Sequence, residues 1–135
     1  MNSIKFDQNG FLWDPNIHDR WLSKLAINDP DTLELQFTDN VNVSAIGIWF
    51  EGCEGFMTCL GGPRIVTELF ISDHEQHDRN REITILESLA PKRFHSEIMT
   101  SFSERLGIEQ KKRFCLLALM DGFVSFWFSQ MRLSN

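Results

Sequence analysis

Hydrophobic and polar residues alternate along several segments of the chain, which is the pattern of β-strands that bury one face. Residues 31–40 are the clearest case, where apolar Leu33, Leu35 and Phe37 alternate with polar Glu34 and Gln36. Residues 41–52 repeat the pattern, with Ile46, Ile48 and Phe50 on one face and Ala45, Gly47 and Trp49 on the other. Residues 65–71 place Ile65, Thr67, Leu69 and Ile71 opposite Val66, Glu68 and Phe70. A further short strand is predicted near residues 56–60, between two glycine-rich turns.

Two dipeptides predict tight hairpins, because each supplies residues that accept the backbone of a two-residue turn. Asn9-Gly10 lies between short apolar segments near the N-terminus, and Asp121-Gly122 joins residues 113–120 to residues 123–133. The two C-terminal segments are almost continuously apolar. Their strands are therefore expected either to be buried on both faces or to keep one face as a docking surface.

One segment predicts a helix, residues 91–107, which begins with Pro91 and ends at Gly107. Its apolar residues recur at helical spacing: Phe94, Ile98, Phe102 and Leu106. Residues 14–31, with Pro15 and Pro30 near their ends, fit a helix or a strand preceded by a short turn, and residues 82–90 fit a short strand or the lead-in to the helix. These patterns predict an α+β fold: mainly antiparallel β-sheet, with one clear helix packed on it and a C-terminal β-hairpin.

The composition is that of one folded domain spanning residues 1–135, with 42% hydrophobic and 24% charged residues. No apolar run is long enough to span a bilayer, and the N-terminus lacks the pattern of a signal peptide. The three cysteines have no paired spacing, which favours a reducing compartment. We therefore expect a cytoplasmic protein without a membrane partner.

The net charge of −6 is unevenly distributed along the chain. Positions 1–60 hold nine acidic and three basic residues, whereas positions 61–135 hold ten of each. An acidic protein repels phosphate backbones, so nucleic acid is not an expected partner. A basic protein partner is favoured, because complementary fields speed encounter; the alternative is that the charge only maintains solubility.

The most polar stretch, residues 72–82, contains the two histidines His74 and His77 among acidic residues. Two imidazoles three residues apart could chelate a metal with a neighbouring carboxylate. The same composition is typical of a solvated connection between two elements, and the H-E-x-x-H spacing of a helical zinc site is absent. We expect no metal here. The histidines could instead make partner binding sensitive to mildly acid pH.

Other candidate chemistry is sparse. Cys53 is flanked by glycines that could expose a nucleophilic thiol, but Glu51 and Glu54 disfavour a thiolate, and a turn cysteine is the alternative. His18-Asp19 could form a base or a structural hydrogen-bonded pair. The sequence has no G-x-S-x-G elbow and no phosphate-binding glycine loop. We therefore expect neither enzymatic activity nor a cofactor.

The order of segments carries a resemblance to a known group of proteins. DPNIHDRWLSKLAI, then DTLELQF, VSAIGIWFEG and RIVTELFIS, resembles small strand-rich immunity proteins of bacterial polymorphic-toxin and contact-dependent inhibition systems. The resemblance covers about the first half of the chain. It implies a protein that binds a cognate toxin domain and occludes its active site, without catalysis.

We therefore predict an immunity protein that contacts a toxin, such as a basic nuclease, as a monomer or a homodimer. Trp49 or Phe56 would be the buried anchor of the contact. The full set of candidate contact residues is Asp39, Trp49, Glu51, Glu54, Phe56, Asp73, His74, Glu75, His77 and Asp78. Two alternatives remain: a small metal-assisted hydrolase using His74 and His77, and a structural subunit that oligomerises through the Phe-rich C-terminal hairpin.

Overall fold

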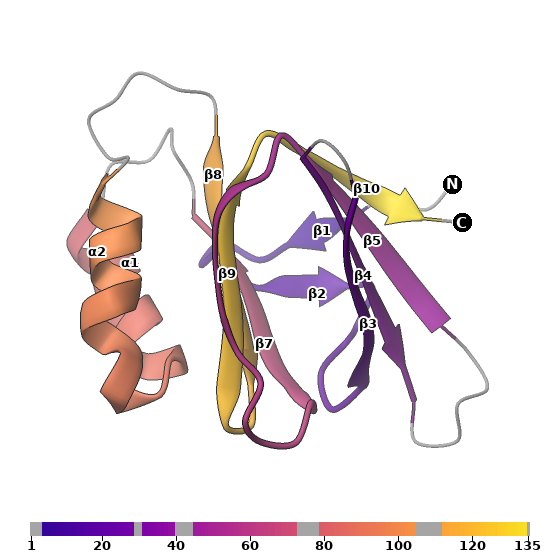
Figure 1. The fold of residues 1–135 in the computed structure, drawn as a ribbon, viewed down its shortest axis with the longest axis horizontal. Coiled ribbons are helices and arrows are strands. Elements are labelled where there is room, and N and C mark those ends of the chain that lie inside the picture. The colour runs from indigo at the N-terminus through magenta and orange to yellow at the C-terminus, as the bar shows by residue number, and fades with distance from the viewer. Residues whose placement is uncertain (1–3, 29–30, 40–44, 73–78, 105–111, 135) are drawn as a thin grey trace.

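The computed structural model describes residues 4–28, 31–39, 45–72, 79–104 and 112–134 (Figure 1). The strands are β1 (Lys5–Phe6), β2 (Leu12–Asp14), β3 (Trp21–Asn28), β4 (Thr32–Thr38), β5 (Ala45–Glu51), β6 (Glu54–Cys59), β7 (Val66–Ile71), β8 (Arg113–Leu119), β9 (Gly122–Phe128) and β10 (Gln130–Ser134). The helices are α1 (Arg79–Leu89), the 3-10 helix η1 (Lys92–Phe94) and α2 (His95–Glu104).

The molecule has three layers, which Figure 1 shows edge-on. One antiparallel sheet has the strand order β10-β5-β4-β3, and the second has the order β6-β9-β8-β7. The two sheets face each other, and α1 and α2 cover the outer face of the second sheet (Figure 1). The predicted α+β class with mainly antiparallel sheet is confirmed. Among the described residues, no helix is long and apolar enough to cross a membrane.

Two adjacent strands pass together from one sheet to the other and form a corner of the sandwich. β5 continues into β6, and β9 continues into β10, with the backbone N–H of Ser129 donating to the carbonyl of Glu51 at 2.9 Å. Gly52 lies between β5 and β6 with a positive φ of 69°, a conformation that glycine adopts without strain. A side chain there would also collide with Ser129. Strands that switch sheets at such bends are how sandwiches turn corners.

The opposite side of the sandwich is joined by hydrogen bonds between β7 and the residues that lead into β3. The N–H of Asp19 donates to the carbonyl of Val66 at 2.9 Å, and the N–H of Val66 donates to the carbonyl of Arg20 at 2.8 Å. The N–H of Leu22 donates to the carbonyl of Arg64 at 2.7 Å. These bonds hold residues 16–20 against β7. The segment left open in the sequence, residues 14–31, contains the strand β3 after a turn, and no helix is present in its described residues.

The inter-sheet core follows the predicted alternation in β4 and β5. Leu33, Leu35 and Phe37 are fully buried, and Ile48 and Phe50 meet them from β5. The prediction was wrong for Val66, which lies in the same core as Leu69 and Ile71 rather than opposite them. The β7–β8 register shifts between Val66 and Glu68. One extra residue in a strand reverses the faces of the residues beyond it.

The helical layer packs on the β8–β9 hairpin through a second apolar cluster. The predicted helix is observed as η1 followed by α2, with Ile98 and Phe102 fully buried, while Leu106 and Gly107 lie outside the described residues. A further helix, α1, precedes it, where the sequence left a strand or a helical lead-in open. The hairpin is thereby buried on both faces. Its phenylalanines are at most 2% exposed, so these side chains do not form the proposed oligomer interface.

The predicted N-terminal hairpin is confirmed as β1 and β2, which pair antiparallel. Gly10 at its turn has φ of 93°, and its carbonyl accepts a hydrogen bond of 2.9 Å from the N–H of Ile71. Phe11 also forms an isolated antiparallel bridge with Phe70. The hairpin is therefore fixed against the end of β7, beside the segment that leads into β3.

Replacing Lys24 with alanine is expected to lower the free energy of unfolding by about 1 kcal/mol at neutral pH. The Lys24 Nζ lies 2.9 Å from the Glu34 carboxylate, whose side chain is only 10% exposed. The hydrogen bond from Lys24 is the main cause that lowers the pKa of Glu34 below its ordinary 4.5. A lowered pKa stabilises the fold above the unfolded-state value, so the contribution is lost as the pH falls through the folded-state pKa.

Urea denaturation of the Lys24→Ala variant at neutral and at acid pH measures this effect. Lys92→Ala serves as the control, because Lys92 is exposed on η1. A destabilisation of Lys24→Ala that persists unchanged in acid would show that the aliphatic stem of Lys24, and not its charge, matters.

Candidate functional site

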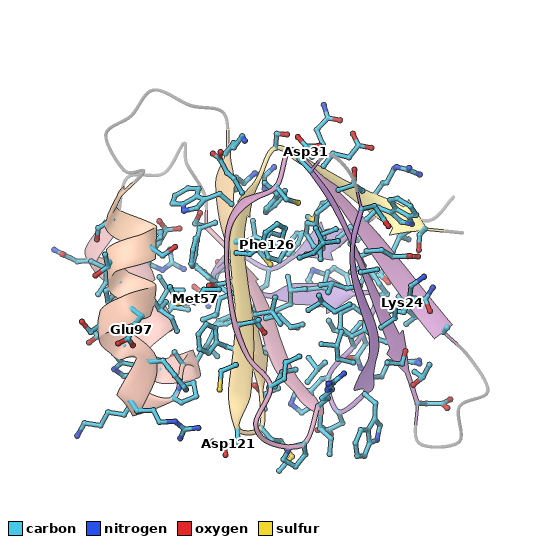
Figure 2. All side chains as sticks on the ribbon, viewed as in Figure 1. Lys24, Asp31, Met57, Glu97, Asp121 and Phe126 are labelled. Carbon is cyan, nitrogen blue, oxygen red and sulfur yellow. The ribbon has the colours of Figure 1, made fainter. Side chains whose placement is uncertain are left out.

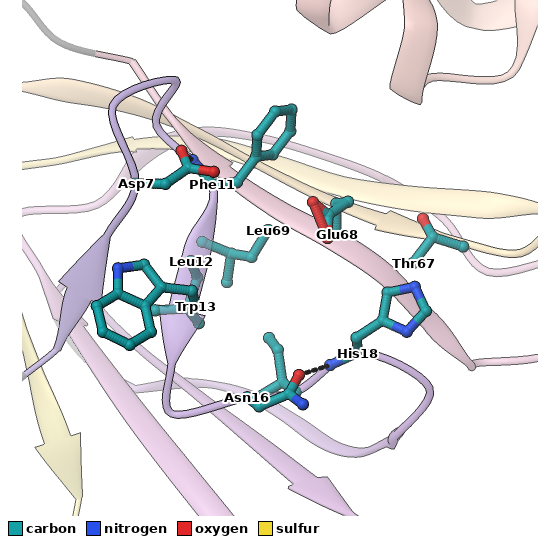
Figure 3. Close-up of a pocket in the computed structure, with 10 residues that line it drawn as sticks. Asp7, Phe11, Leu12, Trp13, Asn16, His18, Thr67, Glu68 and Leu69 are labelled. Atoms are coloured by element: carbon teal, nitrogen blue, oxygen red, sulfur yellow. Dashed lines mark hydrogen bonds between the residues drawn. The ribbon is translucent and has the colours of Figure 1, made fainter.

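A cleft of about 320 Å³ opens between the N-terminal hairpin, the segment before β3 and the strand β7 (Figure 3). It is lined by Asp7, Phe11, Leu12, Trp13, Asn16, Ile17, His18, Thr67, Glu68 and Leu69. Two of these residues are acidic, five are apolar or aromatic, and none is lysine or arginine. Such a mixture of apolar walls and a few convergent polar groups is typical of a binding site.

The turn of the hairpin fixes Asp7 at the rim of the cleft. Its Oδ1 accepts hydrogen bonds from the backbone N–H of Asn9 at 2.8 Å and of Phe11 at 2.9 Å. Aspartate bonds to the backbone of a following turn in this way because its side chain is short. Arg81 of α1 donates to the carbonyl of Gln8 and to the side chain of Asn9, which attaches the turn to the helical layer.

Glu68 reaches the cleft from β7, next to the bulge that moves Val66 into the core. Its side chain is half-buried. Burial is the main cause that raises the pKa of Glu68 above its ordinary 4.5; the nearby His18 lowers it, and the nearby Asp7 raises it. Two carboxylates therefore face one small cleft, which is the arrangement that attracts a cation.

His18 closes one end of the cleft. Its backbone N–H donates to the side-chain oxygen of Asn16 at 3.1 Å, which Figure 3 marks with a dashed line. Its Nδ1 lies 3.2 Å from the Asp19 carboxylate, and both side chains are more than half exposed. Asp19 has a positive φ of 66° and marks a sharp turn before β3. The His18–Asp19 pair predicted from the sequence is thus present, as an exposed polar pair at the rim.

Trp13 forms the aromatic wall of the cleft. It lies on β2, and 55% of its surface is exposed, which is unusual for so large an apolar side chain. The Nζ of Lys5, from the paired strand β1, lies 5.6 Å from the centroid of its ring. Figure 3 shows the ring of Trp13 across the cleft from Glu68 and His18. The face of an indole ring attracts cations through its quadrupole.

The described contact candidates lie in different parts of the molecule. Trp49 and Glu51 lie together, where Arg132 sits 5.4 Å from the Trp49 ring centroid and 3.6 Å from Glu51. Asp39 follows β4 beside the start of β5, at the end opposite Glu51. There it lines a second, shallower groove of about 520 Å³ with Trp21, Pro63 and Arg64.

The remaining described candidates are engaged elsewhere. The Glu54 carboxylate lies 3.3 Å from the Nζ of Lys112. Phe56 is 38% exposed and packs against Phe126 at 5.7 Å between ring centroids. Five candidates lie outside the described residues: Asp73, His74, Glu75, His77 and Asp78. Among the described residues, no three His, Cys, Asp or Glu side chains are grouped so that they could hold a metal ion.

Cys53 is not placed as a nucleophile. Its thiol is buried, with 6% of its surface exposed, and burial is the main cause that raises its pKa to about 11. At neutral pH the thiol is therefore protonated, and the thiolate is the reactive form. Burial also raises the pKa of Cys115 well above its ordinary value. Both cysteines belong to the inter-sheet core.

The residues of the cleft with the clearest chemistry, Asp7, Trp13 and Glu68, were missed as a site in the sequence. They lie on β2, β7 and the turn before β2, and only the pairing of distant segments brings them together. Two signals were present: the acidic excess of the N-terminal part, and a glutamate inside an otherwise apolar strand. Neither signal says which residues meet.

Comparison of the chain with protein-family models, with curated proteins and with solved structures finds no match. The resemblance of the first half to immunity proteins therefore stays a prediction. The geometry and the charge of the cleft are the basis for assigning a function.

Glu68→Gln is expected to raise the stability of the protein at neutral pH. A carboxyl group whose pKa is higher in the folded than in the unfolded chain binds its proton more tightly when folded. Stability is therefore lost as the pH rises through the unfolded-state and then the folded-state pKa. Glutamine carries no such charge, so thermal unfolding should show a higher Tm for the variant at neutral pH and no difference in acid.

Glu97→Gln provides a matched control for this measurement. Glu97 is exposed in the first turn of α2, where a negative charge favours the helix, so its removal should not raise the Tm. Figure 2 labels it on the helical layer, on the far side of the second sheet from the first. A lower Tm for Glu68→Gln at neutral pH would contradict the expectation that the charged Glu68 carboxylate destabilises the fold.

Proposed function

We propose that the protein is a non-catalytic binding protein that neutralises a cognate toxin by docking on its basic surface, as an immunity protein does. The observation that carries this proposal is the acidic cleft. Asp7 and Glu68 line it with the exposed ring of Trp13, and none of the described residues that line it is lysine or arginine. Exposed aromatic rings beside charged groups are typical of the few residues that dominate a protein interface.

Two further observations support a basic partner. The excess negative charge of the chain falls in positions 1–60, which supply most of the cleft. A toxin that cleaves nucleic acid carries a basic groove, and an acidic inhibitor is steered toward that groove by its field. The resemblance of residues in the first half to immunity proteins points to the same class. Action in the cytoplasm, where a nuclease meets its substrate, belongs to this proposal.

The proposal is tested with the toxin domain encoded beside the gene of this protein. The purified protein should form a stoichiometric complex with that domain and abolish its activity. Because charge steers the encounter, the association rate should fall as salt is raised, while a partner held only by apolar contact would associate at a salt-independent rate. Failure to bind or inhibit any neighbouring toxin domain would remove the proposed function.

A further inference from the structure

We propose that the cleft is a pocket for one arginine side chain of the basic partner, with the guanidinium placed between the two carboxylates and the ring of Trp13. This inference deepens the proposed function and rests on it for the identity of the partner. The cleft itself can be tested without that partner. Its size, about 320 Å³, lies at the lower end of the range for small-ligand sites, which suits a single side chain.

The carboxylate of Glu68 is the strongest indication that a cation belongs in the cleft. It is half-buried, and none of the described residues that line the cleft with it is lysine or arginine; the nearby group that lowers its pKa is His18. A carboxylate in that position destabilises the fold by its desolvation, and a positive ligand would relieve this cost. Residues that strain the free protein in this way are concentrated at functional sites.

Asp7 supplies a second acceptor at a fixed position. The described hydrogen bonds to its carboxylate use Oδ1, which both turn N–H groups hold. The turn therefore orients the Asp7 carboxylate through Oδ1, and Oδ2 can accept a hydrogen bond from a ligand. Both carboxylates line the same cleft, and Asp7 is one of the nearby charges that raise the pKa of Glu68.

The walls of the cleft favour arginine over lysine or a metal ion. A guanidinium is planar, stacks on an indole ring and donates to two carboxylates at once through its fork of N–H groups. Trp13 offers an exposed ring that already lies near one cation, Lys5, which is itself not part of the lining. Phe11 and Leu12 supply apolar contact for an aliphatic stem. A hard metal ion would require more oxygen ligands than two carboxylates and these walls provide.

The probes that test the pocket are the N-acetyl amides of arginine, lysine and citrulline, titrated into the full-length protein. Citrulline keeps the shape of arginine but replaces the guanidinium by a neutral urea group. The indole N–H of Trp13 and the backbone N–H groups of the cleft report binding in NMR spectra, with the Trp13→Leu variant assigning the indole signal. We expect the arginine amide to bind more tightly than the lysine amide, and the citrulline amide to bind weakest.

Variants separate charge from shape. Glu68→Gln should weaken the arginine amide by roughly ten-fold, since it removes a charge-assisted hydrogen bond. Trp13→Leu should weaken it by roughly two- to five-fold, as expected for an exposed cation–π contact. Glu97→Gln removes the same charge from α2 and should leave binding unchanged. A Tm of Glu68→Gln at or above that of the wild type, measured in the same buffer, shows that its loss of binding does not come from unfolding.

The outcomes distinguish the pocket from the proposed function. Equal binding of arginine and citrulline amides, a lysine amide that binds as tightly as arginine, or wild-type affinity in Glu68→Gln would each overturn the arginine pocket. If the toxin then still binds and its affinity is unaffected by Glu68→Gln, the proposed function stands without the pocket. If the arginine amide binds as expected but no toxin does, the pocket stands and the proposed function fails.

Discussion

Replacing Phe126 with alanine is expected to lower the free energy of unfolding by about 3–5 kcal/mol, enough to leave a domain of ordinary stability marginally folded. Phe126 is fully buried in the inter-sheet core. Its ring meets Phe50 of the facing sheet edge-on, with 4.9 Å between centroids. The alanine would leave a cavity between two sheets that are joined at a bent corner and cannot simply close on it. Urea denaturation followed by circular dichroism measures the loss.

Phe56→Ala is the matched control, because Phe56 touches the same ring from the edge strand β6. Its side chain is 38% exposed, so its removal takes less apolar surface out of the core and opens the site to water rather than leaving a void. The expected loss is about 1–2 kcal/mol. Equal losses of stability for the two variants would contradict this expectation. They would mean that the Phe56 ring contributes as much to the core as the Phe126 ring, although Phe56 is the more exposed of the two.

The strands β4 and β5 of the first sheet could be predicted because their pattern is local. Leu33, Leu35 and Phe37 are separated by polar residues, and a strand with that sequence has one way to bury its apolar side. The helix α2 was predictable for the same reason, since Ile98 and Phe102 recur at helical spacing after a proline. In both cases the residues that decide the element are its own neighbours.

The division into two sheets could not be predicted, because it depends on which distant strands pair. β10 is a short and mostly polar strand, and its sequence does not show that it leaves the β8–β9 sheet at Ser129 to pair with β5. Gly52 permits the companion bend in the adjacent strand, but a glycine between two strands equally predicts an ordinary turn. The corner forms only because the bend at Gly52 and the bend at Ser129 lie side by side in adjacent strands.

The cleft was hidden for a related reason. Whether Glu68 faces a core, a helix or solvent depends on the register shift next to Val66, and a bulge has no simple signature in an alternating segment. Nothing in the sequence shows that Trp13 is exposed, yet 55% of its surface is exposed on β2, beside the two-residue strand β1. The predicted anchors Trp49 and Phe56 share this uncertainty, since exposure of an aromatic ring is set by what packs beside it.

The second large effect is expected for Phe102→Ala on α2. Phe102 is fully buried and stacks on Trp127 with 6.1 Å between centroids and an angle of 9° between the rings. It also meets Phe114 edge-on at 5.4 Å. The indole N–H of Trp127 donates to the carbonyl of Ser101, so Trp127 holds the helix both by packing on Phe102 and by a hydrogen bond. The expected loss is about 3–5 kcal/mol.

The loss of stability in Phe102→Ala should fall mainly on the helical layer, whereas the loss in Phe126→Ala should fall on the two sheets. The helices contact the outer face of one sheet, whereas the strands hold each other through continuous ladders, and regions with fewer tertiary contacts open first. Hydrogen exchange of Phe102→Ala should therefore show faster exchange in α1 and α2 than in β8 and β9. Ser103→Ala, at the exposed neighbouring position, should change stability by less than about 0.5 kcal/mol. Uniformly faster exchange across strands and helices in Phe102→Ala would instead show that the three layers unfold as one unit.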